Sequence, residues 1–284
     1  MAHMRAMTIR IDAHQHFWNP RRGDYGWLTP ELDGLYRSFG PDDLRPLLAA
    51  ADIGGTVLVQ AAPTLAETEY LLGIADATDF VLGVVGWIDF GNPAHLEEID
   101  RLARHSCLKG FRPMIQDIAD PDWMLKQKLD PAFRSLIAHD LTFDALTLPL
   151  HLDRLLALVL RYPALRVVVD HGSKPAIRRQ EFQPWAADIA KIARETTACC
   201  KLSGLVTEAS RGWTAADLKP FVDHLLAEFG PSRLMFGSDW PVCTLASHYQ
   251  RWVETADVLT EGCSAAERQA IFGGTAAAFY RLKA

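Results

Sequence analysis

The chain has 284 residues, of which 49% are hydrophobic and 23% charged, and its formal net charge is −6. This composition is typical of a soluble globular protein that buries a large core. No Lys/Arg-rich run occurs, and the acidic balance argues against nucleic acid or an anionic membrane as a partner. A small neutral or acidic substrate is compatible with it.

Cysteine usage and the N-terminal residues bear on the compartment and on domain limits. The five cysteines are odd in number and lack zinc-motif spacing, which favours reduced thiols in a cytoplasmic protein. No apolar run approaches the roughly 20 residues of a membrane span. The start "MAHMRAM" lacks the apolar core of a signal peptide. We expect residues 1–7 to be a tag or a disordered N-terminus and residues 8–284 to form one domain.

Short apolar runs recur along the chain, and amphipathic segments lie between them. There are eight such runs, at 8–14, 56–62, 80–88, 107–112, 141–146, 166–171, 199–204 and 233–239. Helix start and stop signals frame the amphipathic segments 41–53, 95–105, 151–162, 185–195 and 215–230. Strands that alternate with helices predict a parallel sheet covered on both faces. Eight units in this length favour a closed (β/α)8 TIM barrel over an open sheet.

Residues 17–40 form a long segment rich in aromatic residues, Pro and Gly between the first strand and its helix. Long loops in compact domains are usually functional or disordered, and the aromatic content argues against disorder. We expect this loop to fold over the barrel mouth.

Active sites of such barrels lie at the carboxyl ends of the strands, so the polar residues that end the runs are the candidates for chemistry. Two histidines, His14 and His16, end the first run and point to the same face because strand side chains alternate. The later runs end with or contain Gln60, Trp87, Asp89, Lys109, Arg112, Asp144, Asp170, His171, Ser203 and Asp239, and His151 lies just beyond the fifth.

Each candidate also has an ordinary structural interpretation. The histidine pair can be two unrelated polar residues, and Asp239 in "FGSDWP" can cap a turn. His171 can be a hydrogen-bonded loop residue, and His151 can begin a helix. Arg112 can form a surface salt bridge, although a fixed guanidinium after a strand also suits a carbonyl, carboxylate or hydroxyl-rich ligand.

Two other chemistries are disfavoured. "FGSDWP" lacks the second glycine of the serine-hydrolase elbow G-x-S-x-G. The phosphate-binding patterns G-x-G-x-x-G and G-x-x-x-x-G-K-[ST] do not occur, so nucleotide binding is unsupported.

The sequence resembles the amidohydrolase superfamily, of the amidohydrolase 2 type. The resemblance rests on four motifs that occur in the same order along the chain: "DAHQHFW", "KGFR", "VVVDHGSKP" and "FGSDWP". Further segments such as "KLSGLVTEA" resemble its sugar-lactone hydrolase branch, and L-fuconolactone hydrolases in particular. L-rhamnonolactone, sulfomuconolactone and pyrone-dicarboxylate lactonases share much of this framework. The resemblance implies that His14, His16, His171 and Asp239 form the catalytic core and are the candidate metal ligands.

The resemblance also bears on metal content. Two-metal members of the superfamily carry a bridging residue after the fourth strand, but the "KGFR" context of Lys109 does not resemble such a bridge. We therefore expect at most one divalent cation, for which zinc suits the His and Asp ligands. It need not be required, because the imidazoles can instead hydrogen-bond the substrate carbonyl.

The mechanistic hypothesis is hydrolysis of a sugar lactone to the free aldonate. Asp239 takes a proton from the attacking water, and His14, His16 and His171, or an ion they hold, stabilise the oxyanion. The candidate substrate-binding residues are Arg112, Trp27, His151, Gln60 and Trp87. The alternatives are a metal-dependent non-oxidative decarboxylase and a binding protein without catalytic activity. The expected partner is a small sugar lactone, and a homo-oligomer is compatible with the sequence.

Overall fold

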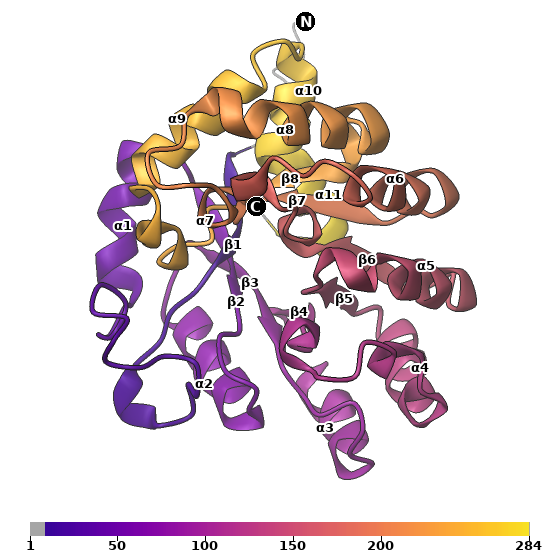
Figure 1. Ribbon diagram of the computed structural model, residues 1–284. Coiled ribbons are helices and arrows are strands. Elements are labelled where there is room, and N and C mark those ends of the chain that lie inside the picture. Colours follow the sequence, from indigo (N-terminus) through magenta and orange to yellow (C-terminus); the bar gives the residue numbers. More distant parts are fainter. Residues whose placement is uncertain (1–8, 284) are drawn as a thin grey trace, which may run out of the picture.

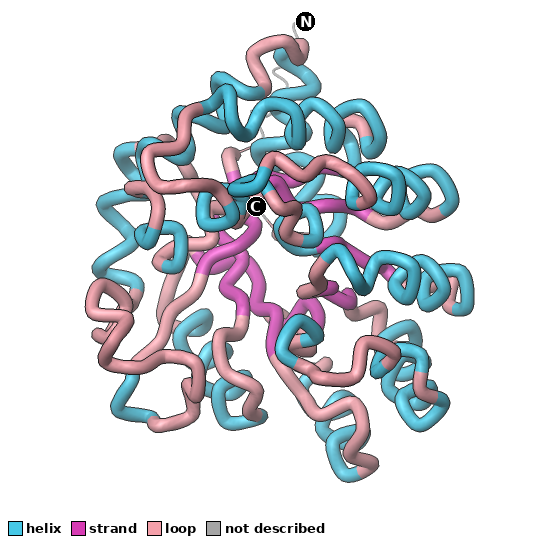
Figure 2. Tube along the Cα trace, in the orientation of Figure 1, coloured by secondary structure: helices cyan, strands magenta, loops and turns pink. Residues whose placement is uncertain are grey.

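The computed structural model describes residues 9–283. Its centre is one sheet of eight parallel strands in chain order, surrounded by helices (Figures 1 and 2). The strands are β1 Ile11–Gln15, β2 Gly55–Val59, β3 Val81–Gly86, β4 Leu108–Phe111, β5 Thr142–Ala145, β6 Arg166–Val169, β7 Cys199–Leu202 and β8 Leu234–Phe236. Each predicted run overlaps one of these strands, so the (β/α)8 prediction is confirmed. The expected tag or disordered segment at 1–7 lies outside the described residues.

The carboxyl end of β1 meets the residues that directly follow β8. The amide of Asp239 donates to the carbonyl of His14 at 2.7 Å, and the amide of His16 donates to the carbonyl of Trp240 at 2.7 Å. The Asp12 carboxylate strengthens this seam by accepting from the amide of Ser238 at 2.8 Å. The seam therefore brings the histidine pair and Asp239 to one place.

Helices cover the outside of the barrel (Figure 1). The longer ones are α1 Pro41–Ala50, α2 Leu65–Asp76, α3 Ala94–Leu102, α4 Asp130–Ala138, α5 Leu152–Arg161, α6 Trp185–Glu195, α8 Ala215–Phe229 and α9 Tyr249–Leu259. Shorter ones are α7 Leu205–Glu208, α10 Ala265–Gln269 and α11 Thr275–Tyr280. The five predicted helical segments correspond to α1, α3, α5, α6 and α8. Among the described residues, no helix is both long and apolar enough to cross a membrane.

The loop at 17–40 is built from turns and one short 3-10 helix, Pro20–Arg22. Its ends are tied together because the backbones of Trp18 and Phe39 exchange two hydrogen bonds, at 3.1 and 2.9 Å. The fully buried Trp18 ring anchors the loop, since its indole Nε1 donates to the carbonyl of Arg37 at 3.0 Å. Trp27 lies on the wall of a cavity at the barrel mouth. The loop is ordered and lies where the sequence predicted it.

Candidate active site

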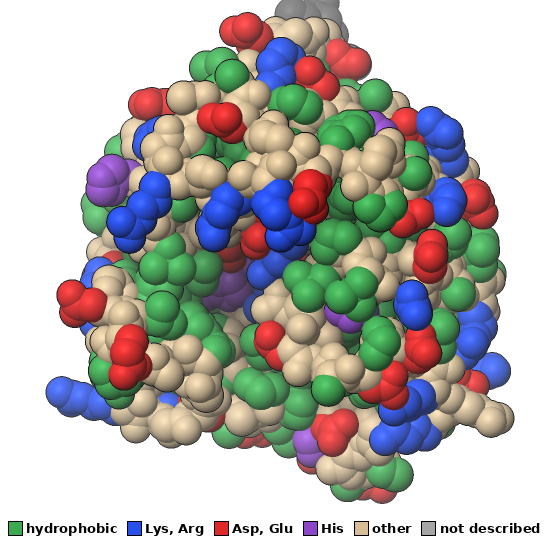
Figure 3. Space-filling model, viewed as in Figure 1, with side chains coloured by type: hydrophobic (Ala, Val, Ile, Leu, Met, Phe, Trp, Pro, Cys, Tyr) green, Lys and Arg blue, Asp and Glu red, His purple; other side chains and the backbone are tan. Residues whose placement is uncertain are grey.

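The barrel mouth contains two adjoining cavities. The smaller, of about 170 Å³, is lined by residues that include His16, Arg112, Lys174 and Asp239. The larger, of about 430 Å³, has an aromatic wall of Trp87, Phe90 and Trp123. The two share Trp27, Met114 and Asp117. Figure 3 shows this hollow from outside, with apolar side chains along one side and histidine at its base.

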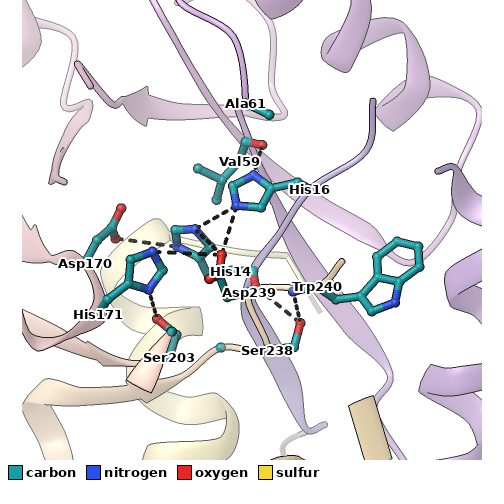
Figure 4. A network of polar contacts seen from close by, with 12 residues as sticks. His14, His16, Val59, Ala61, Asp170, His171, Ser203, Ser238, Asp239 and Trp240 are labelled. Atoms are coloured by element: carbon teal, nitrogen blue, oxygen red, sulfur yellow. Dashed lines mark hydrogen bonds and ion pairs between the residues drawn. The ribbon is translucent and has the colours of Figure 1, made fainter. Parts of the chain in front are cut away.

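His14 of β1 and His16, which directly follows the strand, lie together (Figure 4), and His16 lines the smaller cavity. Their Nε2 atoms are 3.2 Å apart. The Nδ1 of His16 lies 2.8 Å from the carbonyl oxygen of Val59. Because a carbonyl can only accept, this Nδ1 carries a proton and donates it to Val59, which fixes the ring with Nε2 directed toward Asp239.

Asp239 faces all three candidate imidazoles. Its Oδ1 is 3.2 Å from Nε2 of His16, 3.7 Å from Nε2 of His14 and 3.9 Å from Nε2 of His171. Burial raises the pKa of the Asp239 carboxyl, but its interactions with the nearby rings of His171, His16 and His14, including the hydrogen bond from His16, outweigh burial and hold this pKa below its usual value. Asp239 is therefore an ionised carboxylate at neutral pH.

His171 enters the site from an unusual turn after β6. Its φ is 56°, and Gly172, Ser173 and Lys174 follow with φ of 56°, 60° and 52°. The ring is fixed by a contact of 2.8 Å between its Nδ1 and the hydroxyl of Ser203. Burial lowers the pKa of the His171 imidazole to about 4, against the opposing effect of Asp239, so the ring is neutral at pH 7.

Arg112 reaches the same place from the end of β4. Its Nη2 donates to Oε1 of Gln60 at 3.1 Å and also to the Gln60 carbonyl, while Nε2 of Gln60 donates to the Arg112 carbonyl at 2.8 Å. Nη1 of Arg112 lies 3.3 Å from Nε2 of His14. Gln60 thus positions Arg112 and is not among the described residues that line the two cavities.

The other predicted residues have different positions. Trp27 lines both cavities and donates from Nε1 to the carbonyl of Ala61 at 2.7 Å, and Trp87 lines the larger one. His151 is buried, and its Nδ1 accepts a hydrogen bond from the amide of Leu148 at 3.0 Å. It is not among the described residues that line either cavity. The Nζ of Lys109 donates to the carbonyl of Ser106, which directly precedes β4. Lys109 therefore points to the amino end of the strand, away from the histidines.

The structure adds a residue that the sequence reasoning did not single out, Lys201 of β7. It is fully buried, and its Nζ lies 2.7 Å from Oδ2 of Asp144, 3.0 Å from Oδ1 of Asp170 and 3.1 Å from Nδ1 of His14. The signal was a lysine inside the apolar run "CCKLSG", because a buried charge requires partners of opposite charge.

Comparison with known proteins agrees with this geometry. The amidohydrolase family model matches residues 11–282. The chain belongs to the amidohydrolase family. An L-fucono-1,5-lactonase from Burkholderia ambifaria is 44% identical over 280 residues, which cover 97% of each chain. A second L-fucono-1,5-lactonase, from Burkholderia multivorans, is 39% identical over 297 aligned positions, with 97% of each chain covered. A solved zinc-bound amidohydrolase structure from Burkholderia multivorans matches with a TM-score of 0.91 and 39% identity, covering 97% of this chain and 100% of the other.

The donor set of this amidohydrolase fits one divalent metal ion. One ligand atom each from His14, His16 and Asp239 lies within 4.8 Å of the others, and all three residues are buried. Burial and the ammonium group of Lys201 hold the pKa of His14 well below its usual value, so its imidazole is neutral, as a metal ligand must be. Two imidazole nitrogens and a carboxylate oxygen are ligands that suit zinc.

Proposed function

We propose that this amidohydrolase opens a sugar lactone to the free aldonate, with L-fucono-1,5-lactone as its first candidate substrate. The observation that carries the proposal is the ionised Asp239 carboxylate, held among three imidazoles and a guanidinium at the base of a cavity. Such a site supplies a proton acceptor and hydrogen-bond donors within one small volume, as acyl transfer to water requires. The two lactonase relatives, similar over almost their whole length, support the same reaction.

Asp239 is the general base of the proposed reaction. It accepts a proton from a water molecule as the oxygen of that water bonds to the lactone carbonyl carbon. The depressed pKa makes Asp239 a weak base but keeps it ionised over a wide pH range. A weak base suffices for a lactone, whose acyl carbon is more reactive than that of an amide.

Arg112 and His171 stabilise the oxyanion that develops on the carbonyl oxygen. The Arg112 guanidinium is fixed by Gln60 at the side of the cavity, where it can donate without reorganisation. His16 orients the base, because its Nδ1 is held by the carbonyl of Val59 and its Nε2 lies 3.2 Å from Oδ1 of Asp239. When the acyl C–O bond breaks, the proton on Asp239 passes to the ring oxygen, and an aldonate with a free hydroxyl group results.

The sugar lies against the aromatic residues of the two cavities. Trp27 separates the catalytic cavity from the larger one, whose wall includes Trp87. Flat aromatic faces pack against the C–H face of a sugar ring, while carboxylates such as Asp117 accept from its hydroxyl groups. His151 is not among the described residues that line either cavity. It acts indirectly, by holding the amide of Leu148 in the loop after β5.

His14, His16 and Asp239 would hold a single zinc ion. When bound, such an ion polarises the carbonyl oxygen and lowers the pKa of a water ligand. We propose that zinc binds but is not indispensable for lactone opening.

We also propose that the protein works in the cytoplasm, in accord with five free cysteines in the described chain. A homo-oligomer stays a prediction.

The test is a panel of five- and six-membered aldonolactones, followed with a pH indicator that reports the acid released. We expect the fastest turnover with L-fucono-1,5-lactone and slower turnover with related sugars such as L-rhamnonolactone. The rate above that of the Asp239→Asn variant measures catalysis, because lactones also hydrolyse spontaneously. Release of CO2 from a hydroxylated aromatic acid, without opening of any lactone, would replace this proposal by the decarboxylase alternative.

A further inference from the structure

Lys174 lines the catalytic cavity and has no role in the reaction steps given above. Its side chain lies in the wall of the smaller cavity together with Arg112 and Asp239. Burial raises the pKa of the half-buried Glu208 carboxyl, and the positive charges of Lys174 and Arg178 oppose that effect. No ion pair or hydrogen bond joins Lys174 to Glu208, however, and the ammonium group has no such partner among the residues that the structure describes.

The backbone at Lys174 has a conformation that a lysine rarely adopts. Its φ is 52° and its ψ is 65°, in the left-handed region, where residues other than glycine are uncommon. The amide of Lys174 donates to the carbonyl of His171 at 2.9 Å, which holds the turn. Glycine would adopt this conformation freely but would leave the cavity without an ammonium group. Strained residues cluster at functional sites, so the side chain of Lys174 requires a functional explanation.

The other charges of the catalytic cavity have partners or lie at its edge. The guanidinium of Arg112 forms an ion pair with the fully buried Asp170, whose Oδ2 lies 3.5 Å from Nη1. The Asp239 carboxylate contacts the imidazoles. Asp117, the second carboxylate of the described lining, is exposed on the side shared with the larger cavity. The ammonium group of Lys174 therefore adds a positive charge that attracts an anionic ligand.

The proposed reaction produces such a ligand. As the acyl C–O bond breaks, its electron pair goes to the ring oxygen, which takes the proton from Asp239. The acyl group is then a carboxylic acid that carries the second hydrogen of the attacking water, and at neutral pH it loses this proton to solvent. A neutral lactone thus becomes an anion next to an ionised Asp239. The two negative charges repel each other strongly in a small cavity that is shielded from water.

We propose, on the basis of the function proposed above, that Lys174 binds the carboxylate of the aldonate product and offsets its repulsion by Asp239. The lactone is neutral and offers the ammonium group only dipoles, so it gains less from Lys174 than the aldonate does. Lys174 therefore distinguishes product from substrate by charge. It follows that the aldonate is a competitive inhibitor of lactone opening and that its affinity depends on Lys174.

The first measurement is calorimetric binding of two ligands to the wild type and to Lys174→Asn. One ligand is the aldonate, and the other is the alditol of the same sugar, which has a CH2OH group in place of the carboxylate. We expect Lys174→Asn to bind the aldonate roughly tenfold or more weakly, the scale of a hydrogen bond to a charged group, and the alditol within about threefold of the wild type. An unchanged aldonate affinity, or equal losses for both ligands, overturns the proposal.

Three further variants separate charge from structure. Asn and Gly adopt the left-handed region more readily than Lys, so Lys174→Asn and Lys174→Gly should keep or raise the melting temperature while both lose aldonate affinity. Lys174→Arg keeps the charge and should retain most of the affinity. An affinity in Lys174→Arg as low as in Lys174→Asn overturns the role of the charge.

Lys128→Asn is the matched control for net charge. Lys128 is exposed and is not among the described residues that line either cavity. At ~0.15 M salt, charges further apart than about 8 Å are largely screened, so this variant should bind the aldonate as the wild type does. An equal loss of affinity in Lys128→Asn and Lys174→Asn would show a general effect of charge and overturn the proposal.

The last measurement is inhibition of lactone turnover by added aldonate. We expect competitive inhibition of the wild type, with an inhibition constant roughly tenfold or more higher in Lys174→Asn. Noncompetitive inhibition overturns the placement of the aldonate in the catalytic cavity. If the wild type opens lactones and Lys174→Asn binds the aldonate as tightly, only the role of Lys174 fails. If no protein opens a lactone, the proposed function fails, while calorimetry still decides whether Lys174 binds a sugar carboxylate.

Discussion

Gly204 packs against the ring of His171, and its replacement tests whether the position of that ring matters. A Cβ atom at Gly204 would lie 2.6 Å from both Cγ and Nδ1 of His171. Carbon atoms in contact are normally about 3.5 Å or more apart. The atoms in the way belong to the ring itself, so Gly204→Ala must displace the His171 ring by about 1 Å and disturb its hydrogen bond with Ser203. A misplacement of about 1 Å can cost roughly 10²-fold in rate.

Gly212→Ala is the matched control for the backbone. Gly204 and Gly212 have φ of +63° and +78°, so either alanine costs roughly 1–2 kcal/mol in the left-handed region. A Cβ at Gly212 meets no atom within 4 Å. We expect similar small losses of melting temperature in both variants, but a roughly 10²-fold lower kcat/KM only in Gly204→Ala. Gly204→Ala with a third or more of wild-type kcat/KM would refute the role given to His171.

Three further predictions concern single residues. Asp239→Asn should lower kcat by several orders of magnitude with an unchanged circular dichroism spectrum, and retention of a tenth of wild-type turnover would exclude Asp239 as the base. Trp27→Ala should raise KM for the lactone with little loss of melting temperature, because the ring is only partly buried, whereas a large stability loss with unchanged kinetics would identify it as core. Burial raises the pKa of Glu67 to about 8, so its stabilising effect is complete below the unfolded value of 4.5 and is lost as pH rises toward 8. The melting temperature of the wild type relative to Glu67→Gln should therefore fall over this range, by up to roughly 2–4 °C per pH unit, and a constant difference would contradict the assignment.

The barrel could be predicted because each of its strands is a short apolar run and each run ends in polar residues. This pattern follows from a sheet buried on both faces whose carboxyl ends carry the site. The convergence of His14, His16, His171 and Asp239 followed from the same rule. The rule does not say whether a polar side chain at a strand end faces the cavity or a neighbouring part of the protein. The side chain of Gln60 contacts Arg112, and that of His151 contacts the backbone of Leu148.

Lys201 shows what strand ends alone do not reveal. It lies inside an apolar run, between the buried residues Cys200 and Leu202, and Asp144 lies in the same way inside β5. Two opposite charges inside predicted core strands require each other, because an unpaired buried charge costs several kcal/mol. Their pairing could have been inferred from the sequence, but the third partner, His14, could not, because it depends on the stagger of the strands around the barrel.

The backbone at His171 and Asp239 is the feature that the sequence predicts least, because local preference opposes it. Asp239 has a φ of 57°, and His171, Ser173 and Lys174 also lie in the left-handed region, at a cost of roughly 1–2 kcal/mol for each non-glycine residue. Glycine would remove that cost but also the side chains that form the site, and only Gly172 is glycine. Tertiary contacts hold the turn, since Nε1 of the buried Trp185 donates to the carbonyl of Gly172 at 2.7 Å. The fold thus stabilises a strained turn that presents His171 to Asp239 before any substrate arrives, as preorganised catalysis requires.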